Sequence, residues 1–206
     1  MSITYIGHFK SYSMAYNLKD VFYLGATHTF AASTYGSAGI EGNIPIDISA
    51  YVDPIAKGRS RGQGLAVYKV HQSVAGDATG NIPSATDAGS GVFGLTVKPY
   101  VTSGDNSGAL ESGDMTPESD LLIWGGFYTS MATLVPGQGG TNLTQVFCEP
   151  SEEVPYVVVR DTIFQIFENT VAMTSGDSYF ISYRLECAMI TLDSATLNQL
   201  LRTQTA

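Results

Sequence analysis

Apolar and polar residues alternate along much of this chain with the two-residue period of a β-strand. The clearest segment is Tyr179 to Ile190. Its odd-numbered positions carry large apolar residues, namely Tyr179, Ile181, Tyr183, Leu185, Cys187 and Met189, and its even-numbered positions include the polar residues Ser182, Arg184 and Glu186. Successive strand side chains point to opposite faces of a sheet, so this pattern predicts a half-buried strand.

Other segments rich in apolar, β-branched or aromatic residues are bounded by glycine, proline or Ser/Asn clusters, which marks them as strands. They are Ile3–Phe9, Val21–Phe30, Ile44–Tyr51, Leu65–Val74, Val92–Val101, Leu121–Thr133 and Tyr156–Phe167. With the terminal strand the count reaches about eight, the number of a jelly roll. Thr174–Asp177 supplies a turn, so we expect Tyr156–Phe167 to pair antiparallel with the terminal strand.

The predicted fold class is therefore all-β: an antiparallel β-sandwich, a single jelly roll of about eight strands with long loops and a short C-terminal helix. The 206 residues are expected to form one domain, 1–206, because all-β sandwiches often reach this length. Asp193 or Ser194 can cap the helix, in which Leu197, Leu200 and Leu201 form an apolar stripe. So short a helix needs a partner, and its own sheet is favoured over a neighbouring subunit or a membrane surface.

Three connections are glycine-rich and almost without large apolar residues, so we expect surface loops at Ala31–Asn43, Ala75–Gly91 and Thr102–Asp120. The third loop is acidic and contains no basic residue. Its carboxylates are Asp105, Glu111, Asp114, Glu118 and Asp120. They could bind calcium or a basic neighbour or simply face solvent, and the loop lacks the ligand spacing of an EF-hand.

The low content of charged residues indicates an unusual surface. Only 14% of the residues are charged, against about 25% in an ordinary soluble domain, and no apolar run is long enough to span a membrane. A surface with so little charge suggests burial against other copies of the chain. The net charge of −9 argues against direct binding of nucleic acid, which requires lysine and arginine to displace counterions.

The N-terminal segment has neither the cationic nor the apolar region of a cleaved signal, so synthesis in the cytoplasm is expected. Cys148 and Cys187 both lie in strand-like segments. A pair this sparse is more typical of free buried thiols than of a disulfide framework.

We find no catalytic motif and expect no enzyme activity, cofactor or metal site. The three histidines, His8, His28 and His71, occur singly, without the pairings that bind metals. No Gly-x-Ser-x-Gly elbow is present, and neither cysteine has neighbours that would lower its pKa. Glu152 and Glu153 adjoin two prolines in a loop and are interpreted as a solvated rim.

A basic cluster, Lys57, Arg59 and Arg61, stands among glycines before the strand that begins at Leu65. It could be a solvated loop, or it could bind a phosphate, a lipid headgroup or the acidic loop of a neighbouring subunit. In an acidic protein one basic loop is complementary to the remaining surface. We therefore choose Lys57, Arg59 and Arg61 as candidates for intersubunit contact with Asp114 or Glu118.

Four features together point to a known class of protein: the long loops, the low charge, the terminal strand Tyr179–Ile190 and the segment Ile46–Pro54. The chain resembles the single jelly-roll capsid proteins of tailless icosahedral viruses, particularly those with an internal membrane. The resemblance implies a major capsid subunit of the virion, made in the host cytoplasm and standing upright in capsomers. Its partners would be copies of itself, with a second capsid protein and an internal lipid membrane as further candidates.

Two classes of alternative remain open at this point. A phage tail-tube or minor virion protein would also be acidic and β-rich, but it would stack into filaments. A cupin-like or lectin-like sugar-binding jelly roll would need a concave site with converging polar groups. Trp124 lies in an apolar run and is expected in the core rather than on a sugar.

Overall fold

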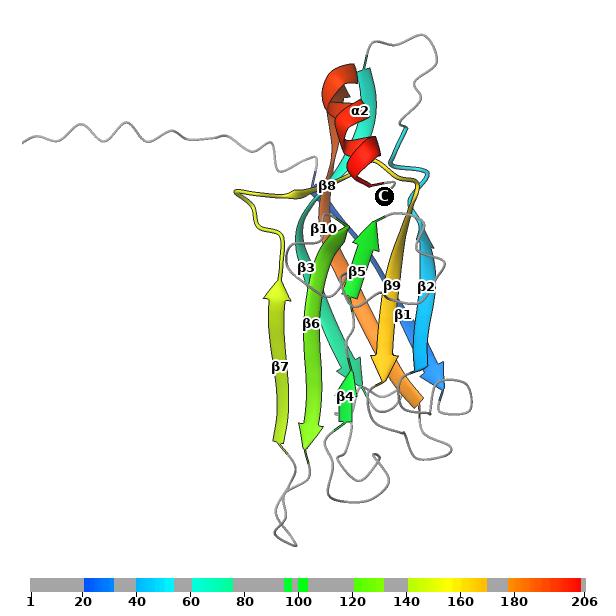
Figure 1. Ribbon diagram of the computed structural model, residues 1–206, viewed down its shortest axis with the longest axis vertical. Coiled ribbons are helices and arrows are strands. Elements are labelled where there is room, and N and C mark those ends of the chain that lie inside the picture. Colours follow the sequence, from blue (N-terminus) through cyan, green and yellow to red (C-terminus); the bar gives the residue numbers. More distant parts are fainter. Residues whose placement is uncertain are drawn as a thin grey trace, which may run out of the picture.

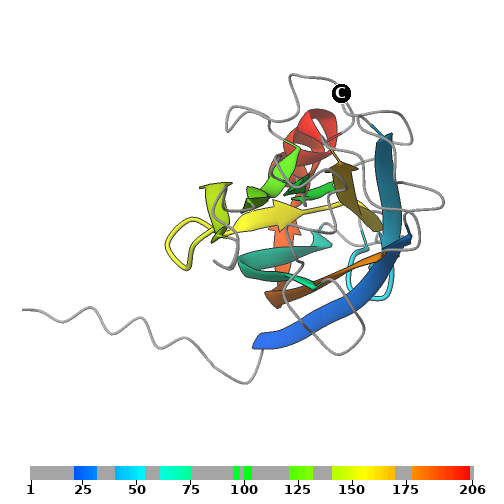
Figure 2. The same ribbon diagram turned by 90° about the horizontal axis from the view of Figure 1, so that it is seen from below.

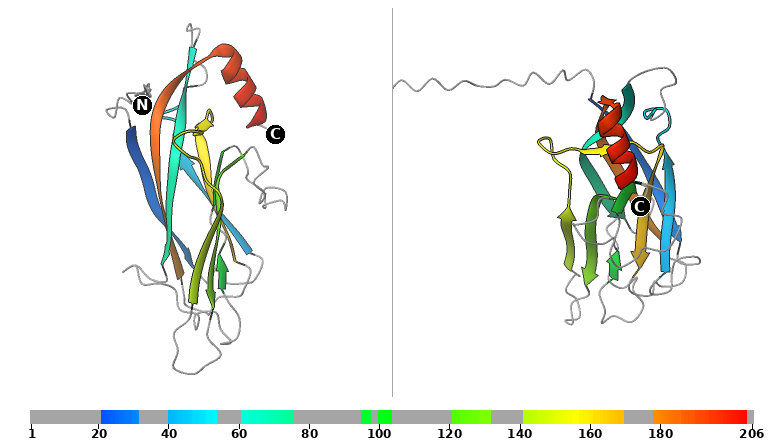
Figure 3. Two further views of the ribbon diagram at one scale, coloured as in Figure 1. Left: turned by 90° about the vertical axis from the view of Figure 1, so that its left-hand side faces the viewer. Right: turned by 45° about the horizontal axis from the view of Figure 1, so that its top comes forward.

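Two antiparallel sheets face each other in the computed structural model, which describes residues 21–31, 40–53, 61–75, 95–97, 100–103, 121–131, 141–169 and 178–204 (Figures 1 and 3). The four-stranded sheet has the order β1 (Val21–Ala31), β10 (Ser178–Asp193), β3 (Arg61–Ala75) and β8 (Tyr156–Val158). The strand expected at Ile3–Phe9 lies outside the described residues.

The six-stranded sheet begins with β2 (Ile40–Asp47) and β9 (Thr162–Asn169). Next come β4 (Leu95–Val97) and β5 (Tyr100–Ser103), which both pair with β9 and with β6 (Leu122–Met131). Finally, β7 (Thr141–Cys148) pairs with β6 at the edge. The segment expected as one strand at Val92–Val101 thus contains two short ones, and β2 begins inside the loop expected at Ala31–Asn43.

The pairing pattern is that of a jelly roll. We take β4 and β5 as one interrupted strand, leave out the edge strand β7, and number the rest 1 to 8 along the chain. Strand 1 then pairs with 8, 2 with 7, 3 with 6 and 4 with 5, all antiparallel. One sheet reads 1-8-3-6 and the other 2-7-4-5. This nesting of a rolled-up antiparallel ribbon confirms the predicted fold class.

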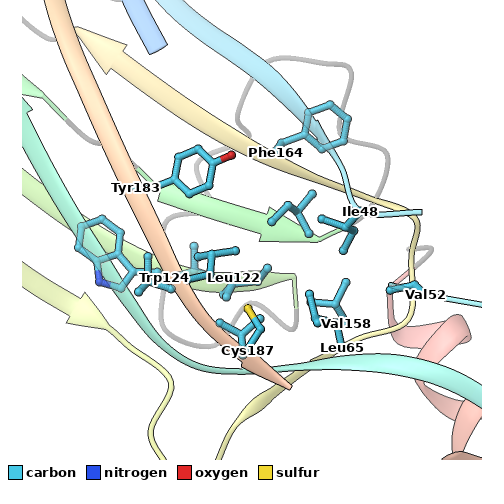
Figure 4. Packing of buried hydrophobic residues seen from close by; sticks show 14 of the residues in the cluster. Ile48, Val52, Leu65, Leu122, Trp124, Val158, Phe164, Tyr183 and Cys187 are labelled. Atoms are coloured by element: carbon cyan, nitrogen blue, oxygen red, sulfur yellow. The ribbon is translucent and has the colours of Figure 1, made fainter. Parts of the chain in front are cut away.

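The core lies between the sheets, where inward-facing side chains interdigitate (Figure 4). Phe30 of β1 stacks on Phe167 of β9 with ring centroids 4.5 Å apart. Leu65 and Leu185 are fully buried, and each such side chain contributes about 1.5 to 3 kcal/mol. Trp124 is in the core, 4% exposed, as its apolar surroundings in the sequence suggest.

The terminal strand follows the predicted parity up to Cys187. The five residues on its apolar side are at most 5% exposed: Tyr179, Ile181, Tyr183, Leu185 and Cys187. Met189, expected on the same side, is 51% exposed. The pairing with β3 shifts between Glu186 and Cys187. Beyond this irregularity Met189 contacts a polar group instead of the core, because Gln63 Nε2 donates to its Sδ at 2.8 Å.

The pairing expected for Tyr156–Phe167 was wrong. This segment divides into β8 and β9, which belong to different sheets, and neither strand pairs with β10. The division occurs at 159–161, where the chain crosses from one sheet to the other and Ile48 N donates to the Asp161 carbonyl at 2.8 Å. In a jelly roll the last two strands lie in opposite sheets, so their closeness in sequence does not make them partners.

The C-terminal helix α2 (Ser194–Thr203) begins as predicted. The Asp193 carboxylate caps it by accepting from the Ala195 and Thr196 amides, both at 2.9 Å. Leu197 is the buried residue of its apolar stripe, and a Cβ placed on Gly62 of β3 would lie 2.5 Å from Leu197 Cδ2. The helix therefore packs on its own sheet. Within the described residues, no helix is long and apolar enough to cross a membrane.

Candidate interaction surface

One flank of the sandwich is an exposed surface formed by β1, β10 and β3. The odd-numbered residues of β1 face outward, because Phe22, Leu24 and Phe30 point to the core. The strand register places side chains from all three strands in rows on this surface. We call it the outer face and define it by Tyr23, Gly25, Thr27, Lys69, His71, Ser73, Ser182, Arg184 and Glu186.

An aromatic and a guanidinium group form the most prominent feature of the outer face. The Arg184 guanidinium carbon lies 3.9 Å from the centroid of the Tyr23 ring, a cation–π contact. Arg184 is directly opposite Gly25 in the register, whereas Tyr23 is opposite Glu186. Because Gly25 has no side chain, Arg184 can extend diagonally across that position onto Tyr23. The tyrosine remains 54% exposed.

A histidine–carboxylate pair lies beside this contact. His71 Nε2 and Glu186 Oε1 are 2.7 Å apart, with side chains 45% and 25% exposed. Exposed pairs of this kind add little stability. Beside this pair, Lys69 and Arg184 are the exposed lysine and arginine side chains of the outer face.

A second exposed feature is the segment 149–155 between β7 and β8, which we call the acidic knob. It contains Glu149, Glu152 and Glu153, and Val154 within it is 74% exposed. A tight turn holds it: Ser151 N donates to the Val154 carbonyl at 3.2 Å, and Val154 N donates to Ser151 Oγ at 3.1 Å. In Figures 1 and 2 the knob is the yellow segment that projects away from the two sheets.

Of the site residues predicted from sequence, the structure describes Arg61. Its exposed side chain belongs to the first residue of β3, which lies opposite Asp193 in the register. Lys57, Arg59, Asp114 and Glu118 lie outside the described residues. The contact between basic and acidic loops therefore stays a prediction.

The sequence interpretation missed Tyr23 and Lys69 as surface features, whereas it did place Glu152 and Glu153 of the acidic knob on a solvated rim. The parity of Ser182, Arg184 and Glu186 did indicate a solvent-facing side of the terminal strand. Which residues of other strands share that side depends on the register of three strands that are far apart in the sequence.

The two cysteines are free thiols, as predicted. Burial, with a contribution from the Glu186 charge, raises the pKa of Cys187 to about 12. Burial also raises the pKa of Cys148. Thiols with raised pKa values are weak nucleophiles at neutral pH. In the part of the chain that the structure describes, no three His, Cys, Asp or Glu residues are grouped so as to hold a metal ion.

A partly buried polar group lies on β1. His28 of β1 stacks on Tyr183 of β10, with ring centroids 5.7 Å apart. Burial lowers the pKa of His28 and raises the pKa of Tyr183 to about 12, so both side chains are neutral at pH 7. This pair belongs to the packing of the sandwich, and the outer face is the better candidate for recognition.

No family model matches the chain, and no curated protein matches its sequence. Solved structures that it resembles include Merkel cell polyomavirus VP1 in complex with disialyllactose (10% identity, TM-score 0.42, covering 84% of this chain and 96% of that one). A second is trichodysplasia spinulosa-associated polyomavirus VP1 in complex with GM1 oligosaccharide (7% identity, TM-score 0.41, covering 84% of this chain and 94% of that one). A third is turnip yellow mosaic virus (8% identity, TM-score 0.28, covering 84% of this chain and 98% of that one). These are jelly-roll capsid proteins of icosahedral viruses. At these identities and TM-scores the similarity says nothing about the role of this chain.

Proposed function

We propose that this chain is a structural subunit that assembles with copies of itself into the capsid shell of a virion. Jelly rolls also serve as lectins and cupins, so the fold by itself does not choose among these functions. The observation that carries the proposal is the outer face, on which Tyr23 and Arg184 form an exposed aromatic and cationic platform.

The composition of the outer face supports this role. Tyrosine and arginine are the residue types that most often dominate the binding energy of protein interfaces. Around them stand small side chains, Thr27, Ser73 and Ser182, which allow a second surface to approach closely. The low overall charge, 14% of residues, is consistent with a chain that works with much of its surface covered.

In this proposal the protein resides in the virion, and copies of itself are its main partners. A second capsid protein and an internal membrane remain further candidates from the sequence. No enzymatic step is assigned. The net charge of −9 disfavours direct contact with the genome, because equal signs repel.

The test is negative-stain electron microscopy together with multi-angle light scattering on the purified chain, at low and high salt. We expect rings, shells or sheets from the wild type and a smaller assembled fraction from Tyr23→Ala. The matched control is Gln199→Ala, an exposed position on α2. A compact monomer or dimer at every salt and protein concentration would overturn the proposal. Filaments would instead favour the tail-tube alternative.

A further inference from the structure

The geometry points to a specific contact between subunits: we propose that the acidic knob of one copy docks on the outer face of the next. This inference rests on the proposed function and names the surfaces through which the subunits assemble. Both surfaces lie within the described residues of a single chain, so each copy has one knob and one outer face.

The acidic knob has the properties of a preformed ligand. It presents the exposed side chains of Glu149 and Glu153 near the exposed Val154. Pro150 and Pro155 restrict the backbone on either side of the Ser151 turn. A segment that is already ordered loses little conformational freedom on binding.

The outer face has the complementary properties. Lys69 and Arg184 are exposed cations, while Glu186 is engaged by His71 at 2.7 Å. Tyr23 offers an apolar ring on which a side chain such as Val154 could pack. In a chain with a net charge of −9, most approaches between copies are repulsive, so a local match of opposite charges sets the orientation.

Lys69 lies on β3, the strand next to β8, but Tyr23 lies at the far edge of the sheet from the knob, which favours a second copy as the partner for that part of the outer face. The knob leads directly into β8, whereas Tyr23 lies on β1, and these are the two edge strands of the four-stranded sheet. Strands are spaced by about 4.8 Å, so the two edges are about 14 Å apart. A contact that joins one edge of a subunit to the opposite edge of its neighbour is heterologous, so it repeats from copy to copy and forms a ring where the rotation between copies closes.

The experiment is a charge swap in the full chain. Arg184→Glu and Glu153→Lys each place like charges in the contact, and the combined variant restores opposite charges with their positions exchanged. We expect each single reversal to raise the protein concentration needed for half-assembly about tenfold or more, because like charges facing each other oppose binding strongly. The combined variant should recover most of the assembly.

Arg202→Glu and Asp161→Lys are the matched controls, since they make the same changes of charge at exposed positions outside both surfaces. Urea unfolding of each variant confirms that the fold is retained. If both single reversals assemble as the wild type does, or if the combined variant is no better than the single ones, the knob and the outer face do not contact each other. A wild type that never assembles refutes the proposed function itself, which is a separate result.

Discussion

Gln204, the residue after α2, joins the end of the helix to the backbone near β8, and its loss should measurably lower the free energy of unfolding. The residue is 3% exposed, and its side-chain amide bonds twice to the backbone of the segment around β8. Oε1 accepts from Val159 N at 3.1 Å, and Nε2 donates to the Val157 carbonyl at 2.6 Å. The amide thus takes the place of a neighbouring strand at the edge of the four-stranded sheet.

Gln204→Ala removes both bonds and leaves two backbone groups without partners. The Arg160 Nε donates at 3.1 Å to the main-chain carbonyl of Gln204, so the substitution keeps that bond. An unpaired buried polar group costs about 1 to 3 kcal/mol. Water can enter part of the space left by the side chain, so we expect the free energy of unfolding to fall by about 2 to 4 kcal/mol.

Urea unfolding measures this change, with fluorescence of the buried Trp124 as the signal. For a urea dependence of about 2 kcal/mol per molar, the midpoint should fall by about 1 to 2 M with an unchanged slope. Gln204→Glu keeps the acceptor for Val159 but sets a carboxylate against the Val157 carbonyl, so it should destabilise at neutral pH and less in acid. Thr203→Ala, which removes an exposed bond to the Leu200 carbonyl, is the control. A midpoint shift for Gln204→Ala no larger than that of the control would refute the reasoning.

Three further predictions concern the packing, the helix cap and the thiols. Gly25→Ala should lower the free energy of unfolding by about 1 to 3 kcal/mol in a urea titration, because its Cβ would lie 2.6 Å from the Tyr183 carbonyl oxygen; an unchanged midpoint would contradict this. Hydrogen bonds from Thr196, backbone and then side chain, lower the pKa of Asp193 below 3.8, so its carboxylate stabilises the fold above pH about 4. That contribution should disappear as the pH falls through the lowered value, and Asp193→Asn should flatten this part of the stability profile. Cys187, with a pKa of about 12, should react with iodoacetamide at pH 8 only after urea is added, and rapid labelling of the native protein would show that the site opens.

The sequence determined the local elements of this protein. The alternation in Tyr179–Cys187 depends only on which residues are apolar, and the strand that it predicts buries those same residues. The same is true of α2, because Asp193 and Leu197 act within one or two helical turns of their own position. The number of strands led to the jelly roll because short half-buried strands must be packed into two layers.

Only the tertiary structure decided which strands are neighbours and which residues share a surface. Tyr156–Phe167 reads as one apolar strand, yet the requirement to cover both sheets divides it between them. Tyr23 and Arg184 are separated by most of the chain, and their contact depends on the pairing of β1 with β10 and on the missing side chain of Gly25. Pairing is set by the burial of every inner face at once, which is a property of the whole sandwich, so the outer face could not be read from any single segment.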